Sequence, residues 1–96
     1  MSNRLVFRPQ AQKEILAARD RYERLRRGLG VAFSAAVESA VQRLVENPLT
    51  YPCVHGEIRR VILRRFPYAV FYRVLGSEIV VLGVVHGHRH PGSWRS

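Results

Sequence analysis

Residues 57–94 read EIRRVILRRFPYAVFYRVLGSEIVVLGVVHGHRHPGSW, and this stretch decides the fold. It contains three runs rich in β-branched and aromatic residues, separated by Phe66-Pro67 and by Gly76-Ser77. Such runs are typical of β-strands, and the short breaks between them predict turns. Because strands joined by short connections usually pair with their neighbours, the stretch predicts an antiparallel meander.

The residues before this stretch predict two helices that cover the sheet. Between residue 9 and about residue 27, apolar side chains recur three and four positions apart. A second pattern of this kind follows Gly28 and ends at Asn47-Pro48. This spacing places apolar side chains along one face of a helix. Gly28 is expected to cap the end of the first helix.

Two shorter segments complete the predicted order of elements. Residues 3–8 predict a strand, which Pro9 ends, and residues 49–56 predict a turn-rich connection. The order is therefore β-α-α-β-β-β within a single domain spanning residues 1–96. The fold class is α+β, with a helical hairpin packed on a small antiparallel sheet.

The charge of the chain predicts an anionic partner. The 96 residues carry a net charge of +9, from 16 Lys and Arg against 7 Asp and Glu. Lys13 is the only lysine, so almost all of this charge is on guanidinium groups. These groups suit phosphates, base edges and carboxylates, which makes the expected partner a nucleic acid or an acidic protein.

Cysteine content and hydropathy predict a cytoplasmic location. The only cysteine is Cys53, so no internal disulfide can form. The sequence begins with no apolar stretch typical of a signal peptide, and no apolar run approaches the roughly 20 residues of a membrane span. We therefore expect a protein of the reducing cytoplasm with no membrane contact.

The last two predicted strands, residues 68–75 and 79–85, are apolar on both faces. The helices can cover only one face of the sheet, so we expect the other face to be exposed and to bind a partner. Its side chains would be those of Tyr68, Val70, Tyr72 and Val74, or of their odd-numbered neighbours.

Two parts of the stretch carry a resemblance to a known family. Residues 64–74 read RRFPYAVFYRV, and residues 86–94 have the form His-x-x-Arg-x-Pro-x-x-Trp. Together with Asn47-Pro48 after the second helix, they resemble the ParE/RelE family of toxins from bacterial type II toxin–antitoxin, or plasmid stabilisation, modules. The similarity covers nearly the whole chain. It implies a cytoplasmic toxin that a cognate acidic antitoxin neutralises.

The resemblance leaves two targets open. RelE-like members are ribosome-dependent endonucleases that cut mRNA, whereas ParE-like members inhibit DNA gyrase and lack the nuclease residues. Arg60 and Arg89 occupy two of the basic positions of the nuclease, but Ile62 and Ala69 replace two others. This departure favours the ParE branch, with gyrase as the partner, inhibited by protein–protein contact. The alternatives are an mRNA endonuclease acting on the ribosome and a non-toxic basic module that binds nucleic acid.

The resemblance and the charge pattern together name the candidate site residues. A nuclease needs acid–base groups and cations around the scissile phosphate, and these would be Arg60, His86, Arg89 and His90. The residues expected to contact the target or phosphate are Arg60, Arg64, Arg65 and Arg89. The residues expected to contact the antitoxin are Arg59, Tyr68, Val70 and Tyr72. We expect no cofactor and no metal, because the alternating histidines near residue 88 have no Asp, Glu or Cys nearby in the sequence.

Overall fold

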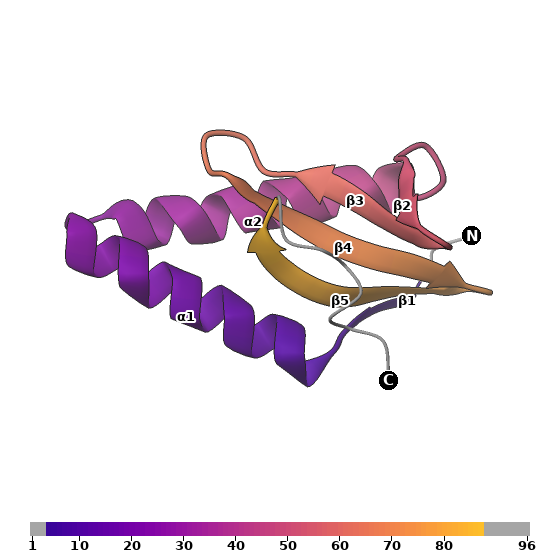
Figure 1. Cartoon of the computed structure of the whole chain (residues 1–96), viewed down its shortest axis with the longest axis horizontal. Helices are drawn as coiled ribbons and strands as arrows, with labels where there is room; N and C mark the ends of the chain where they lie inside the picture. The colour runs from indigo at the N-terminus through magenta and orange to yellow at the C-terminus, as the bar shows by residue number, and fades with distance from the viewer. Residues whose placement is uncertain (1–3, 88–96) are drawn as a thin grey trace.

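In the computed structural model, residues 4–87 are described, and they form two helices packed on one face of a five-stranded sheet (Figure 1). The elements in chain order are β1 Arg4–Phe7, α1 Pro9–Leu25, α2 Leu29–Glu46, β2 Cys53–His55, β3 Ile58–Ile62, β4 Tyr68–Leu75 and β5 Glu78–His86. The predicted α+β class, the helical hairpin and the meander of the last three strands are confirmed.

The sheet has the strand order β1-β5-β4-β3-β2 and is mixed, where an antiparallel sheet was expected. β1 pairs in parallel with β5, from Arg4 opposite Glu78 to Phe7 opposite Val81. No tight turn joins β1 to its partner, so hairpin geometry does not force it to run antiparallel. The connection before β3 also contains a short strand, β2, which pairs antiparallel with β3 and which the sequence pattern did not predict.

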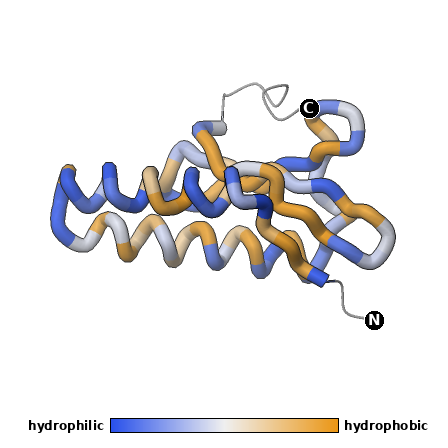
Figure 2. Tube along the Cα trace, turned by 90° about the horizontal axis from the view of Figure 1, so that it is seen from below, coloured by the Kyte–Doolittle hydropathy of each residue, from blue (hydrophilic) through white to orange (hydrophobic). Residues whose placement is uncertain are grey.

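The core lies between the sheet and the helices. Figure 2 shows hydrophobic residues along the central strands and alternating hydrophobic and hydrophilic residues along the helices. At one end of this core, three aromatic rings pack around the ring of Phe33, which is fully buried. The ring centroids of Phe33 lie 5.3 Å from those of Tyr22, 5.4 Å from Phe66 and 5.2 Å from Tyr68. This cluster joins both helices to the start of β4.

The expectation of a widely exposed apolar sheet face is wrong. Val70 and Tyr72 point to the helices and are fully buried in the core. On the opposite face, Ala69 and Phe71 are also buried, in a smaller cluster with Val85 and with the partly buried Val54 and Ile58. Both faces of β4 are therefore occupied near its centre, because the β2–β3 end of the sheet contributes side chains to the second face.

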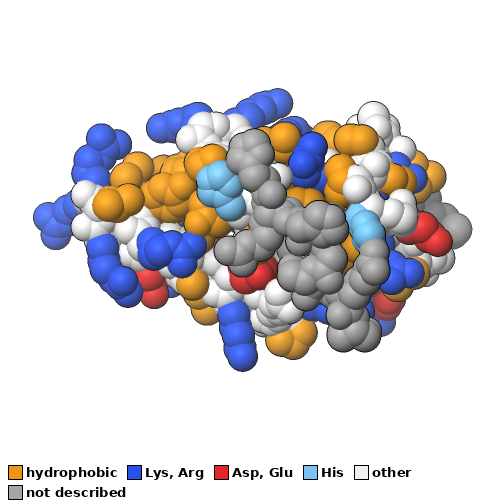
Figure 3. Space-filling model, in the orientation of Figure 1, with side chains coloured by type: hydrophobic (Ala, Val, Ile, Leu, Met, Phe, Trp, Pro, Cys, Tyr) orange, Lys and Arg blue, Asp and Glu red, His pale blue; other side chains and the backbone are white. Residues whose placement is uncertain are grey.

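Positive charge is spread over the surface. Figure 3 shows Lys and Arg side chains around the outline of the molecule, including the end formed by the α1–α2 turn. Arg24, Arg26 and Arg27 at this turn are all exposed. Within residues 4–87 the ion pairs are Arg4 with Glu78 at 3.9 Å and Arg19 with Asp20 at 4.0 Å. Most of the described cations therefore have no carboxylate partner within 4 Å.

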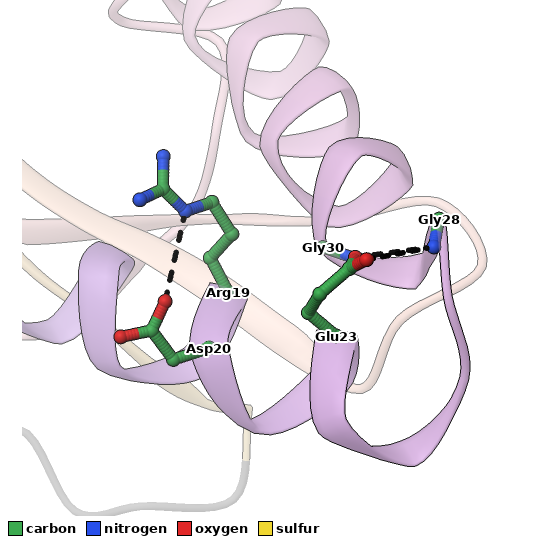
Figure 4. Close-up of polar contacts among 5 residues, drawn as sticks. All are labelled: Arg19, Asp20, Glu23, Gly28 and Gly30. Carbon is green, nitrogen blue, oxygen red and sulfur yellow. Dashed lines mark hydrogen bonds and ion pairs between the residues drawn. The ribbon is translucent and has the colours of Figure 1, made fainter.

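The turn between the helices is organised by Glu23 (Figure 4). Its Oε1 accepts hydrogen bonds from the backbone N–H groups of Gly28 at 3.1 Å and Gly30 at 2.9 Å, and Oε2 accepts from Gly28 at 3.1 Å. These donors, Gly28 first, lower the pKa of the Glu23 carboxyl. Gly28 has a φ of 93° and is the N-cap of α2, whereas α1 ends at Leu25 with Arg26 as its C-cap, so the predicted role of Gly28 as the cap of the first helix is corrected.

Candidate functional site

Two of the predicted nuclease residues, Arg60 and His86, lie within residues 4–87, and they project from different faces of the sheet. Arg60 pairs with Phe71 across β3 and β4, whereas His86 pairs with Tyr68 across β4 and β5. Phe71 belongs to the cluster on the face away from the helices, and Tyr68 packs against the core under the helices. Because successive side chains of a strand alternate between faces, Arg60 and His86 project to opposite sides. Arg89 and His90 lie outside the described residues.

On the face that carries Arg60, apolar residues occupy the two positions where a RelE-like nuclease would have basic residues. Ile62 and Ala69 are Cα partners on this face, Ile62 being 54% exposed and Ala69 fully buried. Arg60 itself is partly buried and donates from Nη1 to the backbone carbonyl of Gly87 at 3.3 Å. Arg73 also lies on this face; it is half-buried, and its Nε has no hydrogen-bond partner among the described residues. Arg73 was not among the candidate residues, although its position two residues after Phe71 places it on the same face.

Arg59 has a structural task in the described chain. Its Nη1 donates to the carbonyl oxygens of Leu49 at 3.0 Å and Tyr51 at 2.6 Å. The hydroxyl of Tyr72 donates to the carbonyl of Pro48 at 2.6 Å. Burial raises the pKa of Tyr72 to about 12, against a smaller lowering effect of Arg59. Both side chains hold the connection between α2 and β2, and Tyr72, like Val70, is fully buried in the described structure.

Arg64 and Arg65 lie in the turn between β3 and β4 and not on a strand. They therefore lie beyond the strand that carries Arg59 and Arg60. Both are exposed, and Arg65 has a φ of 74°, a conformation in the left-handed region. This turn presents two guanidinium groups to solvent, where a partner can reach them.

A second group of polar side chains gathers where α1 passes beside the end of β5. We call this hollow of about 170 Å³ the α1–β5 corner; it is lined by Glu14, Ala17, Arg21, Tyr68, Val84, Val85 and His86. Arg21 Nη2 donates to the Tyr68 hydroxyl at 2.6 Å, and the rings of Tyr68 and His86 have centroids 5.9 Å apart. Glu14 Oε1 accepts the backbone N–H of Val84 at 2.9 Å.

Sequence reasoning predicted only part of the α1–β5 corner. Tyr68 and His86 were candidate residues, whereas Glu14 and Arg21 were not. Their spacing from Ala17, at positions i, i+3 and i+7, places them on one helix face. The missing information was that this face lies beside the end of β5, which the sequence pattern does not give.

The described residues contain no group of three or more His, Cys, Asp or Glu side chains that could hold a metal ion. In the same part of the chain, neither helix is both long and apolar enough to cross a membrane.

Comparison with known proteins identifies one matching family and several solved structures with a similar fold. Residues 5–91 match the model of the ParE toxin of the type II toxin–antitoxin system parDE. A search of curated proteins finds no match. A chain of the chromosomal ParDE system from P. aeruginosa superposes with a TM-score of 0.79 at 21% identity, covering 88% of this chain and 96% of that one.

Two other solved structures are also similar. A chain of the toxin–antitoxin complex RelBE2 from Mycobacterium tuberculosis gives a TM-score of 0.61 at 22% identity, covering 90% of this chain and 99% of that one. A double arginine-to-alanine mutant of E. coli toxin RelE in the free state gives 0.60 at 17% identity, covering 92% and 86%. At these identities the three likenesses show a shared fold.

Proposed function

The chain belongs to the ParE family of toxins from type II toxin–antitoxin systems, and we propose that it acts by binding DNA gyrase and inhibiting it through protein–protein contact. The observation that carries this proposal is the pair Ile62 and Ala69. These residues leave the Arg60 face without cations at two positions where a RelE-like nuclease would have them. Loss of one transition-state electrostatic contact typically lowers a rate by about a hundred- to a thousand-fold, so two such losses leave little capacity for cleavage.

The separation of Arg60 from His86 supports the same proposal. An acid–base group and a phosphate-binding cation must approach the same scissile bond, within hydrogen-bond reach of their targets. Here the two side chains project from opposite faces of the sheet. The exposed Arg64 and Arg65 in the β3–β4 turn are our candidates for target contact, together with Arg60 and with Arg89 beyond the described residues.

We further propose that a cognate acidic antitoxin neutralises the toxin in the cytoplasm. The net charge of +9 favours an acidic partner, and solved structures with the same fold include a toxin–antitoxin complex. Of the four residues first expected to bind it, Tyr68 is half-buried at the α1–β5 corner and Arg59 is partly buried. Exposed apolar residues such as Ile62 and Leu75, at 54% and 42%, offer additional contact area.

The proposal is tested with two assays on the same protein. Gyrase supercoiling of relaxed plasmid and cleavage of ribosome-bound mRNA are measured for the wild type, His86→Gln and the double variant Arg64→Ala/Arg65→Ala. We expect the wild type and His86→Gln to inhibit supercoiling equally and to leave mRNA intact, with weaker inhibition by the double variant. Arg24→Ala, exposed on α1, is the matched control. Cleavage of mRNA by the wild type that His86→Gln abolishes would establish the endonuclease instead.

A further inference from the structure

We propose that the α1–β5 corner is a binding site for a carboxylate side chain of an acidic protein segment, with Arg21 and Tyr68 as its binding groups. The proposal rests on the proposed function in one respect only: the acidic segment is taken to belong to the antitoxin. The site lies at the edge of the sheet, on the side that the helices cover. It is separate from the Arg60 face and from the β3–β4 turn, which we assign to the target.

The polar groups of the corner are arranged to donate hydrogen bonds to an anion. The Tyr68 hydroxyl accepts its bond from Arg21 Nη2 at 2.6 Å, so its own proton is available to an acceptor. The guanidinium keeps further N–H donors, and no carboxylate of the described residues lies within 4 Å of it. His86 is exposed beside the Tyr68 ring and adds a third polar wall.

The carboxylate already present in the corner does not satisfy Arg21. Glu14 Oε1 accepts the backbone N–H of Val84 at 2.9 Å, and Oε2 accepts the side-chain amide of Gln10 at 3.2 Å. Glu14 thereby takes the place of a neighbouring strand beyond Val81, where β1 no longer covers β5. Its role is to close the sheet edge, and the arginine across the hollow is left to an external acceptor.

The lining of the hollow favours an acidic side chain over a nucleic acid. Ala17 and Val84 line the hollow between its polar groups, and their apolar atoms suit the methylene groups of a glutamate or aspartate below its carboxylate. A guanidinium fork also matches the planar geometry of a carboxylate. Nucleic-acid affinity instead comes from several cations along successive phosphates. The corner has one arginine, which suits a single carboxylate and not a row of successive phosphates.

The test is an NMR titration of the isotope-labelled full chain with an acetylated, amidated tetraglutamate peptide. We expect saturable shifts of the Arg21 side-chain N–H and of the Tyr68 ring. Arg21→Gln should weaken this binding about tenfold, as for loss of a charge-assisted hydrogen-bonded pair. Arg24→Gln removes the same charge from the same helix outside the corner, and it should leave binding unchanged.

Tyr68→Phe keeps the ring in the aromatic cluster and removes only the hydroxyl, so it decides the question even if Arg21→Gln does not fold. It should weaken tetraglutamate binding roughly three- to tenfold. Equal effects of Arg24→Gln and Arg21→Gln would mean that the peptide is attracted by the general positive charge and not bound at the corner, and this would overturn the inference. If single-stranded tetrathymidylate binds more tightly than tetraglutamate and shifts the same resonances, the ligand of the corner is a nucleic acid and the inference is wrong.

The titration uses neither gyrase nor antitoxin, so its failure is separate from failure of the proposed function. A chain that inhibits supercoiling but shows no saturable shift at Arg21 would leave the proposed function standing and remove the carboxylate site. A chain that binds tetraglutamate at the corner but does not affect gyrase would keep the carboxylate site and remove the proposed function.

Discussion

At the scale of single residues, the arginines and tyrosines of this chain divide into structural and accessible groups. Arg59 and Tyr72 both bind backbone carbonyls of the connection between α2 and β2, and Tyr72 is fully buried. Arg21, Arg64 and Arg65 are exposed. In the sequence these arginines and tyrosines cannot be told apart. Their hydrogen bonds and exposure in the structure distinguish the two groups.

The first prediction concerns Tyr72. Tyr72→Phe should lower the free energy of unfolding by about 1–2 kcal/mol at neutral pH, because the Pro48 carbonyl loses its buried donor. Chemical denaturation measures this change. Tyr51→Phe is the control, since the Tyr51 hydroxyl has no hydrogen bond within residues 4–87 and its carbonyl still binds Arg59.

The same variant has a characteristic pH dependence. Burial raises the pKa of Tyr72 from 10.0 to about 12, so the folded state favours the neutral phenol. The stabilisation is fully present below pH 10 and is lost as the pH rises to about 12. The stability difference between wild type and Tyr72→Phe should therefore shrink over this range. A difference that stays constant up to pH 12 would show that the hydroxyl is not held in its neutral form by the fold.

At the scale of elements, the α1–α2 turn depends on one carboxylate. Glu23→Gln should lower the melting temperature at neutral pH, because a charged acceptor of the Gly28 and Gly30 N–H groups is replaced by a neutral one. The pKa of Glu23 is lowered from 4.5, so its stabilisation is present above pH 4.5 and is lost as the pH falls through the lowered value. Melting curves of wild type and variant should then converge in acid.

Asp20→Asn is the matched control for this prediction. Asp20 is an exposed acid on the same helix, with a single contact of 4.0 Å to Arg19 (Figure 4). Exposed ion pairs of this kind contribute little to stability, so this variant should melt as the wild type does at every pH. Equal destabilisation by the two substitutions would mean that net charge, and not the turn, accounts for the effect of Glu23.

Elements with a strong local pattern were predictable from the sequence, and those that depend on distant partners were not. The meander and the two helices follow from β-branched runs, turn residues and helical spacing. The parallel direction of β1 depends on β5, which lies some seventy positions later in the chain. The residues of β2 form a strand only because β3 lies beside them. The α1–β5 corner required the same long-range information, as did the assignment of Val70 and Tyr72 to the covered face.

The aromatic cluster that joins the helical hairpin to β4 gives a third prediction. Phe33→Ala should lower the free energy of unfolding by about 3–5 kcal/mol, as expected for removal of a large buried ring. Phe33→Leu should cost much less, because it fills most of the same space. Denaturant unfolding followed by far-UV circular dichroism measures both. If both variants lower the free energy of unfolding by the same small amount, the cluster does not stabilise the packing of the hairpin on the sheet.

At the scale of the whole molecule, the excess positive charge and the α1–β5 corner should affect different steps of binding. Long-range attraction from a net charge of +9 speeds the encounter with an acidic partner. Contacts made at a specific site instead determine how long the complex lasts. The α1–α2 turn, with exposed Arg26 and Arg27, lies at one end of the molecule and contributes charge without lining the corner (Figure 3).

The last prediction compares these two regions by stopped-flow kinetics with the proposed antitoxin. Arg26→Glu/Arg27→Glu reduces the net charge by four and should slow association, with dissociation changed by less than about twofold. Arg21→Gln should mainly speed dissociation, since it removes a contact and only one charge. Raising the salt from about 0.1 M to about 1 M shortens the screening length from roughly 10 Å to 3 Å. The turn variant should then associate at the wild-type rate, whereas Arg21→Gln should still dissociate faster. Faster dissociation of the turn variant in high salt would instead make the α1–α2 turn part of the contact surface, because screening removes steering before it removes direct contacts.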